Sequence, residues 1–344
     1  MEDNERAQKF GFTQAERMQW FNVRYDDIAH GVLAPGARRI YLGDKVDRQC
    51  RYCEKTYPAV TFRRVAHAFP EQIGNKTLID YLECDTCNEH FSTMVEDDFA
   101  KWTMPLRTIG RVQGKRGGPT HKTTDEKMRV EATAPQNLHV ETIRDDPRYT
   151  VDEDNHTITF TMLRQPYVPM GVFKCLVKTA IAVLPPEEIP RCSHLKRWIL
   201  EPVHTYESYA YKPLNVIQQT IPGPLPHDRI SYCLLRRRPG SDAVPYMLFV
   251  LQFSNYIFQI TLPMHVEDES LLSGKPFDMG LFPHIWGNPV YEKQYGLSRY
   301  RIDDLSGTTK LTDSVAKITV SYERAIDMSP KGDSPPMAAA DSSP

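Results

Sequence analysis

The chain has 344 residues, and its 42 Lys and Arg residues nearly balance its 44 Asp and Glu residues, for a net charge of −2. This balance excludes a protein that attracts nucleic acid through its overall charge, so any such site must be a local basic patch. No segment approaches the ~18 consecutive apolar residues of a membrane span. Residues 1–9 are polar and lack the apolar core of a signal peptide, so we expect a cytoplasmic protein with no membrane partner.

The length favours two domains rather than one. Residues 1–46 predict a lead-in with a helix at residues 15–25 and a short strand at residues 38–42. Residues 47–124 hold the paired cysteines and a basic loop. The tail at residues 329–344 is rich in Pro, Ser and Ala, a composition that predicts disorder.

Residues 135–326 predict a larger mixed domain of unknown role. Residues 172–184 place apolar side chains at helical spacings and stop at Pro185-Pro186, and a second helix is expected at residues 187–200. Strands are predicted at residues 157–162, 246–253, 256–263 and 317–322. The middle two flank Ser254-Asn255 and indicate a hairpin or two adjacent strands.

Four of the seven cysteines form two Cys-x-x-Cys pairs, Cys50 with Cys53 and Cys84 with Cys87. Such a pair lets both sulfurs reach one tetrahedral Zn²⁺, and two pairs complete a closed shell, which predicts a structural zinc. A redox-active pair is the alternative, but it needs only one such motif. The remaining cysteines are expected to be small buried apolar side chains; they are Cys175, Cys192 and Cys233.

The 30 residues between Cys53 and Cys84 exceed the ~15–20 of a plain zinc ribbon, so a further unit is inserted there. Residues 60–62 alternate like a strand that leads to His67, residues 79–84 predict a return strand, and residues 88–101 predict a helix. Two strands and a helix in this order would place His67 and Asn88 on facing surfaces.

The order of the motifs resembles that of the HNH endonucleases, in the branch whose ββα-metal finger is framed by zinc knuckles. The matching motifs, over roughly residues 47–100, are Cys50-x2-Cys53, Ala66-His67-Ala68-Phe69-Pro70-Glu71, Gly74-Asn75-Lys76 and Cys84-x2-Cys87-Asn88. The stretch on to Pro119 is similar to a group of uncharacterised bacterial HNH proteins. The resemblance implies an α+β protein in which a zinc-stapled ββα-metal module precedes a larger α+β domain, and an endonuclease that cuts DNA, in a bacterial antiviral setting.

The resemblance also implies roles for three residues. His67 would be the general base, because an imidazole with a pKa near ~6.5 is mostly neutral at pH 7. Asn88 would bind a catalytic divalent metal, Mg²⁺ or Mn²⁺, through its side-chain oxygen. Asn75 would brace the loop that holds His67, and the spacing leaves Asp80 as an alternative for that role.

Position 66 departs from the family pattern. Many HNH proteins carry a metal ligand just before the base, whereas Ala66 cannot bind metal. Either Asn88 alone anchors a largely hydrated ion or another side chain compensates. Glu96, eight residues after Asn88, is a candidate, whereas His90 would point elsewhere on a helix.

Residues 101–124 contain no acidic residue. We expect five basic side chains there to contact phosphates of DNA, namely Arg107, Arg111, Lys115, Arg116 and Lys122. Two other readings stay open at this point. The module could be a zinc-stapled DNA-binding unit that has lost catalysis, or the C-terminal domain could be a sensor or a docking site for a protein partner that controls the nuclease.

Overall fold

The computed structural model describes residues 13–115, 117–134, 137–143, 146–207, 214–241, 243–262, 266–268, 279–324 and 326. Arg116, the first twelve residues and the tail at residues 329–344 therefore lie outside the described residues. The described part mixes helices and strands and confirms the predicted α+β class. None of its helices is long and apolar enough to cross a membrane.

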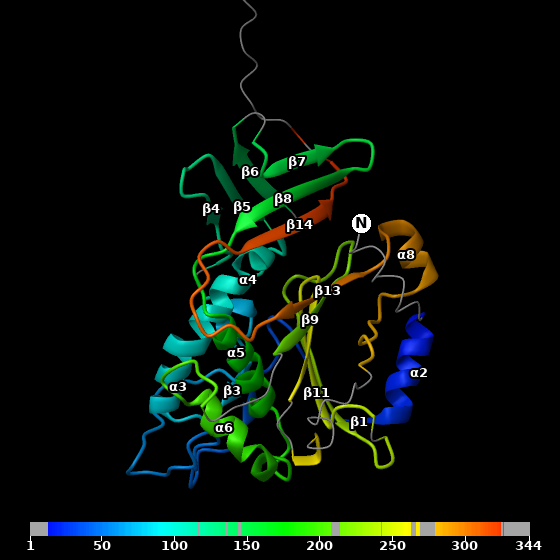
Figure 1. Cartoon of the computed structure of the whole chain (residues 1–344). Helices are drawn as coiled ribbons and strands as arrows, with labels where there is room; N and C mark the ends of the chain where they lie inside the picture. Colours follow the sequence, from blue (N-terminus) through cyan, green and yellow to red (C-terminus); the bar gives the residue numbers. More distant parts are fainter. Residues whose placement is uncertain are drawn as a thin grey trace, which may run out of the picture.

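A six-stranded antiparallel sheet forms the centre of the molecule (Figure 1). In spatial order its strands are β1 (Tyr25–Leu33), β10 (Ile230–Arg237), β11 (Met247–Phe253), β12 (Tyr256–Thr261), β9 (Asn215–Thr220) and β13 (Arg299–Asp304). The turn Ser254-Asn255 joins β11 to β12, which confirms the predicted hairpin. The helix expected at residues 15–25 is α2 (Gln14–Arg24), but strand β1, which follows it directly, was not predicted.

Helix α5 (Pro169–Ala182) lies between this sheet and the helices on its other side (Figure 1). All fourteen of its residues are buried, and it begins at Pro169, whose fixed φ suits the first turn of a helix. It ends just before Pro185-Pro186, as predicted. The second predicted helix is split into a 3-10 turn (Ile189–Cys192) and α6 (Ser193–Ile199).

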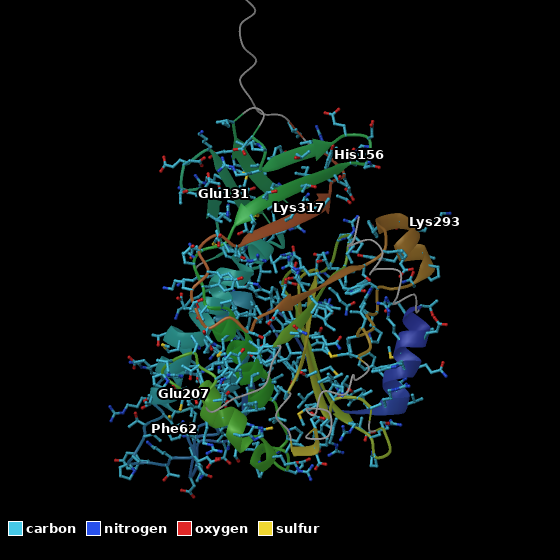
Figure 2. All side chains as sticks on the ribbon, viewed as in Figure 1. Phe62, Glu131, His156, Glu207, Lys293 and Lys317 are labelled. Atoms are coloured by element: carbon cyan, nitrogen blue, oxygen red, sulfur yellow. The ribbon has the colours of Figure 1, made fainter. Side chains whose placement is uncertain are left out.

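Two small sheets form one end of the molecule. One contains β4 (His121–Lys122), β5 (Met128–Ala134) and β6 (Asn137–Thr142), and the other contains β14 (Val315–Ser321), β8 (Thr157–Leu163) and β7 (Tyr149–Asp152). The predicted strands 157–162 and 317–322 thus pair with each other across the sequence. Figure 2 shows Lys317 and His156 of this end far from Phe62, which marks the cysteine-rich segment at the opposite end.

The segment around His67 has less strand than predicted. Strand β3 (Leu78–Asp80) pairs in parallel with β2 (Ile40–Leu42), and His67 forms a single antiparallel bridge with Ile79. The prediction of a strand at residues 60–62 is wrong, because those residues form an irregular loop. The Asp85 carboxylate accepts the backbone N–H groups of Arg63 and Arg64, so these donors are not available to a sheet partner.

The predicted return strand and helix also have different bounds. Strand β3 stops at Asp80, because the Asp80 carboxylate accepts the N–H of Leu82 and turns the chain into the second cysteine pair. The helix begins three residues earlier than predicted and runs on past residue 101. It consists of α3 (Asp85–Phe91), a π-helical segment (Ser92–Glu96) and α4 (Asp97–Ile109).

Helices α4 and α5 approach closely at Gly171, where an added Cβ atom would lie 2.2 Å from Oδ2 of Asp98. The other oxygen of Asp98 accepts the N–H of Val168 at 3.0 Å, which fixes the carboxylate in place. We predict that Gly171→Ala lowers the free energy of unfolding by about 1–3 kcal/mol through overpacking. Urea unfolding measures this, and an unchanged or higher midpoint, as helix propensity alone would give, would contradict it.

Candidate active site

The four paired cysteines converge. Their sulfur atoms lie within 4.8 Å of one another and form no disulfide. Sγ of Cys50 is 3.7 Å from that of Cys87, and Sγ of Cys53 is 3.8 Å from that of Cys84. Two sulfurs bound at ~2.3 Å to one tetrahedral zinc are ~3.8 Å apart, so the four residues fit a Zn²⁺ ion.

Local backbone contacts hold the two pairs in place. The N–H of Glu54 bonds to the carbonyl of Cys50 and closes a turn at the first pair, and the second pair lies at the start of α3. Three of the four cysteines are buried. A closed shell of this kind is typical of a structural rather than a catalytic metal. In the described part of the chain, no other group of three or more His, Cys, Asp or Glu side chains is close enough to hold a metal.

The three scattered cysteines are packed as predicted. Cys175 and Cys192 are buried, and Cys233 is half-buried against apolar side chains. Burial raises the pKa of the Cys192 thiol to about 12, so it is protonated at neutral pH. These side chains therefore behave as small apolar residues.

A cleft of about 730 Å³ is lined by residues that follow both cysteine pairs in the sequence, but by none of the four cysteines. Its lining brings together three predicted site residues from different elements: His67 from the loop before β3, Asn88 from α3 and Glu96 from the π-helical segment. The other residues that line it are Arg64, Val65, Glu71, Gln72, Glu89, Ser92, Thr93, Arg107, Gly114, Lys115, Gly117, Gly118 and Pro119. One cleft thus gathers an imidazole, an amide, carboxylates and basic groups.

The His67 imidazole is 20% exposed, and its Nε2 lies 3.8 Å from Oε1 of Glu71. Burial lowers the pKa of His67, and although the charge of Glu71 acts against this shift, the charge of Lys178 supports it. Glu96 and Lys115 exert smaller effects of opposite sign. A lowered pKa keeps the ring neutral at pH 7, which is the state that can accept a proton.

Asn75 closes the loop that carries His67. Its side chain is fully buried and donates to the carbonyls of Phe69 and Leu78, at 2.8 and 3.0 Å. Its oxygen accepts the N–H groups of Thr77 and Leu78. Asp80 instead lies 3.8 Å from Arg51 beside the first cysteine pair. The contacts therefore favour Asn75 over Asp80 as the residue that braces the loop.

Asn88 and Glu96 both line the cleft and both carry side-chain oxygen atoms. Among the described residues no group hydrogen-bonds the Asn88 side chain, so its oxygen can take a ligand. Oε1 of Glu96 lies 3.2 Å from Nζ of Lys178. Glu96 ends a π-helical segment, a helix irregularity that occurs frequently at functional sites. His90 faces away, with its Nε2 3.0 Å from the carbonyl of Ile199.

Ala66 cannot contribute a ligand in this geometry either, because it is 2% exposed and faces the core. Sequence reasoning missed Glu71, which lies beside both His67 and Lys115. The sequence feature that could have indicated Glu71 is its position four residues after His67. Glu71 begins a short 3-10 turn (Glu71–Ile73). It also missed Arg64, whose exposed guanidinium lines the same cleft.

The basic residues predicted to contact phosphates are not all equivalent. Lys115 lines the cleft and is 77% exposed. Arg107 is buried, its guanidinium donates to the carbonyls of Ala100 and Gln72, and burial lowers its pKa to about 10. These donors are used inside the protein, although Arg107 also lines the cleft, so its contact with phosphate stays a prediction. Arg111 and Lys122 are not among the residues that line the cleft.

Residues 50–103 match the family model of the HNH endonucleases. This segment is an HNH endonuclease domain. The match includes both cysteine pairs, His67, Asn88 and Glu96, and it ends within α4. It indicates nuclease activity on nucleic acid. No curated protein and no solved structure matches the chain.

We predict that the protein, purified without added metal, carries one zinc per chain by elemental analysis. Cys84→Ser should lose this zinc and unfold the HNH domain, because a structural zinc contributes on the order of 10 kcal/mol to folding. Cys192→Ser, which changes a buried cysteine outside the cluster, should keep it. A folded protein without zinc would overturn the assignment.

Proposed function

We propose that this protein is a metal-dependent endonuclease that hydrolyses phosphodiester bonds of DNA. The observation that carries the proposal is the convergence of His67, Asn88 and Glu96 on one cleft, within the segment that matches the HNH family. The sequence gives these residues separately, and the fold supplies a common space for them.

His67 acts in this proposal as the general base. Its neutral ring accepts a proton from the attacking water, and Glu71, 3.8 Å from Nε2, stabilises the imidazolium that forms. Asn75 keeps the His67 loop in one conformation through four hydrogen bonds. A base held in this way needs little reorganisation during the reaction.

Asn88 and Glu96 are the residues that would hold the catalytic metal, Mg²⁺ or Mn²⁺. Oxygen ligands from an amide and a carboxylate suit these ions. When bound, the metal supplies stabilisation of the charge that develops on the phosphate and on the leaving oxygen. This ion is distinct from the structural zinc, whose four sulfur ligands leave no open position.

The DNA backbone would be bound by Lys115 and Arg64 at the rim of the cleft and by the glycine-rich segment that includes Gly114 and Gly118. Thiolate ligands require a reducing compartment, which supports action in the cytoplasm. Roles in antiviral defence, and control by a protein partner through the C-terminal domain, extend the proposal on the family resemblance alone.

The alternative is a zinc-stapled DNA-binding module without catalysis. Ala66 favours it, because the position before the base lacks a metal ligand and faces the core. This alternative predicts binding of DNA with no cleavage at any metal concentration. Plasmid nicking with Mg²⁺, Mn²⁺ or EDTA separates it from the endonuclease.

We predict that Lys115→Ala weakens DNA binding and reduces the log–log dependence of affinity on salt by ~0.9 for the lost phosphate contact. Fluorescence anisotropy at several salt concentrations measures both effects. Lys317→Ala, which removes an exposed charge that does not line the cleft, is the matched control and should leave the slope unchanged. Equal slopes for Lys115→Ala and the parent would refute the contact.

We predict that His67→Ala reduces the cleavage rate by roughly 10²–10⁴-fold, the usual contribution of a general base, while DNA binding persists. Asn88→Ala should also lose cleavage, but through weaker metal binding, so high Mn²⁺ should restore part of it. High Mn²⁺ should not restore His67→Ala, because no ion replaces the base.

Zinc content and a thermal melt show whether each of these variants is folded. A folded His67→Ala protein that binds DNA and cuts at the parent rate would remove His67 from the mechanism. A different outcome, in which the parent protein itself fails to cut, would favour the binding module without catalysis.

A further inference from the structure

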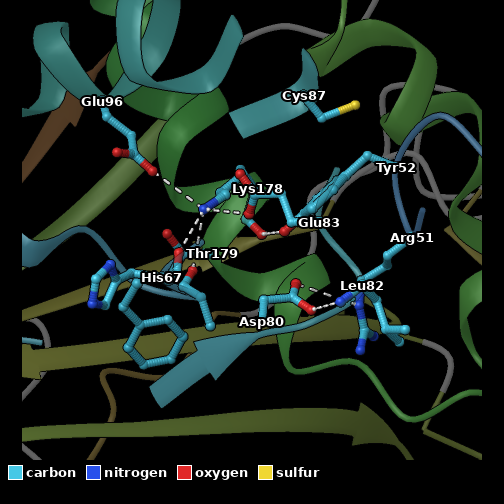
Figure 3. Close-up of polar contacts among 12 residues, drawn as sticks. Arg51, Tyr52, His67, Asp80, Leu82, Glu83, Cys87, Glu96, Lys178 and Thr179 are labelled. Carbon is cyan, nitrogen blue, oxygen red and sulfur yellow. Dashed lines mark hydrogen bonds and ion pairs between the residues drawn. The ribbon is translucent and has the colours of Figure 1, made fainter. Parts of the chain in front are cut away.

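Lys178 places a charged group from helix α5 directly behind the candidate active site (Figure 3). It lies outside residues 50–103 and is fully buried. Its Nζ donates to the carbonyl of His67 at 3.0 Å and lies 3.2 Å from Oε1 of Glu96. It also lies 3.1 Å from Oε2 of Glu83, which is fully buried as well.

A buried ammonium group is costly unless its three donors meet acceptors or opposite charges. Here the carboxyl groups of Glu83 and Glu96 flank the ammonium, and the His67 carbonyl takes a further donor. Burial raises the pKa of Glu83 to about 8, against the opposing charge of Lys178. Burial alone would lower the pKa of Lys178, but these carboxylates raise it well above the usual value, so Lys178 stays charged.

The acceptors of Lys178 belong to two parts of the site, a loop and a helix, whose relative position must stay fixed. His67, the proposed base, lies on the loop before β3. Glu96 lies on the helix that also bears Asn88. The Gln72 amide donates to the backbone carbonyl of Glu96 at 2.8 Å and ties the loop to the helix backbone, but it does not hold the Glu96 carboxylate. Lys178 contacts both parts at once.

We propose that Lys178 is a positioning residue of the nuclease, which holds the His67 loop and the Glu96 carboxylate in a fixed relation from outside the HNH segment. The inference rests on the proposed function of His67 and Glu96. It assigns helix α5 of the larger domain a direct part in the active site, so that the HNH segment alone would be an incomplete nuclease.

Removal of the Lys178 charge would change the pKa of His67 in a defined direction. Four charged groups influence the imidazole, namely Glu71, Lys178, Glu96 and Lys115. Lys178 lowers the pKa of His67, and Glu96, which raises it, would lose its neutralising partner. Both changes raise the pKa of His67. Because the base must be neutral, the acidic limb of the pH–rate profile would move to higher pH.

The test uses the full-length protein and plasmid DNA at saturating Mg²⁺. Lys178→Met combined with Glu83→Gln removes the buried pair without leaving Glu83 as an isolated charge, which favours a folded protein. Lys174→Met is the matched control, since Lys174 lies one turn earlier on α5, is equally buried, and contacts Val203 and Glu201 instead. Lys178→Arg, which keeps the charge, is measured in parallel.

We predict a 10–100-fold lower kcat for the double variant, as for other residues that orient catalytic groups, with the acidic limb shifted to higher pH and little change in DNA affinity. Lys174→Met should keep the parent kcat and pH profile. Lys178→Arg should keep the acidic limb of the parent and cut faster than the double variant.

Three outcomes would overturn the inference. They are a folded double variant with the parent kcat and pH profile, a kcat loss without a shift of the acidic limb, and a shift of that limb in Lys178→Arg as well. Failure of the proposed function itself looks different, because the parent would then not cut with any divalent metal, or His67→Ala would cut as the parent does.

Discussion

The buried ammonium of Lys178 is the interaction on which the arrangement of the site depends. An unpaired charge at that depth would cost several kcal/mol, so the ammonium is tolerated only where Glu83, Glu96 and the His67 carbonyl surround it together. Each of these partners comes from the HNH segment, whereas Lys178 comes from α5. The charge of Lys178 therefore meets its partners only when both the HNH segment and α5 are folded.

This dependence bears on the division of the chain into domains. The family match covers residues 50–103, yet the apolar core is continuous from the HNH segment through α5 into the six-stranded sheet. Strand β1, from the N-terminal lead-in, pairs with β10 in that same sheet. The domain boundaries near residues 46 and 135 thus remain predictions from the sequence. In the structure, the segments on either side of each boundary pack against one another.

Sequence reasoning succeeded where a short-range pattern sets the structure. The cysteine spacing predicted the four-sulfur cluster, and helical periodicity predicted α5, because neighbours along the chain determine both. It failed where distant contacts decide. The strand predicted at residues 60–62 does not form, because Asp85 accepts the backbone donors after it, and no local pattern in the chain pairs Lys178 with His67. The internal contacts of Arg107 could not be predicted for the same reason, since only the fold shows that its guanidinium donates to the Ala100 carbonyl.

The absence of a ligand at position 66 fits the electrostatics of this cleft. Asn88 is neutral, and Lys178 offsets part of the charge of Glu96, so these two proposed ligands would offer a catalytic metal little net negative charge. Mg²⁺ is commonly bound by one or two carboxylates together with substrate phosphates. In the proposed enzyme, the scissile phosphate would therefore supply the charge that Ala66 does not. Metal and DNA would then bind cooperatively, each strengthening the other by the same factor, as linkage requires.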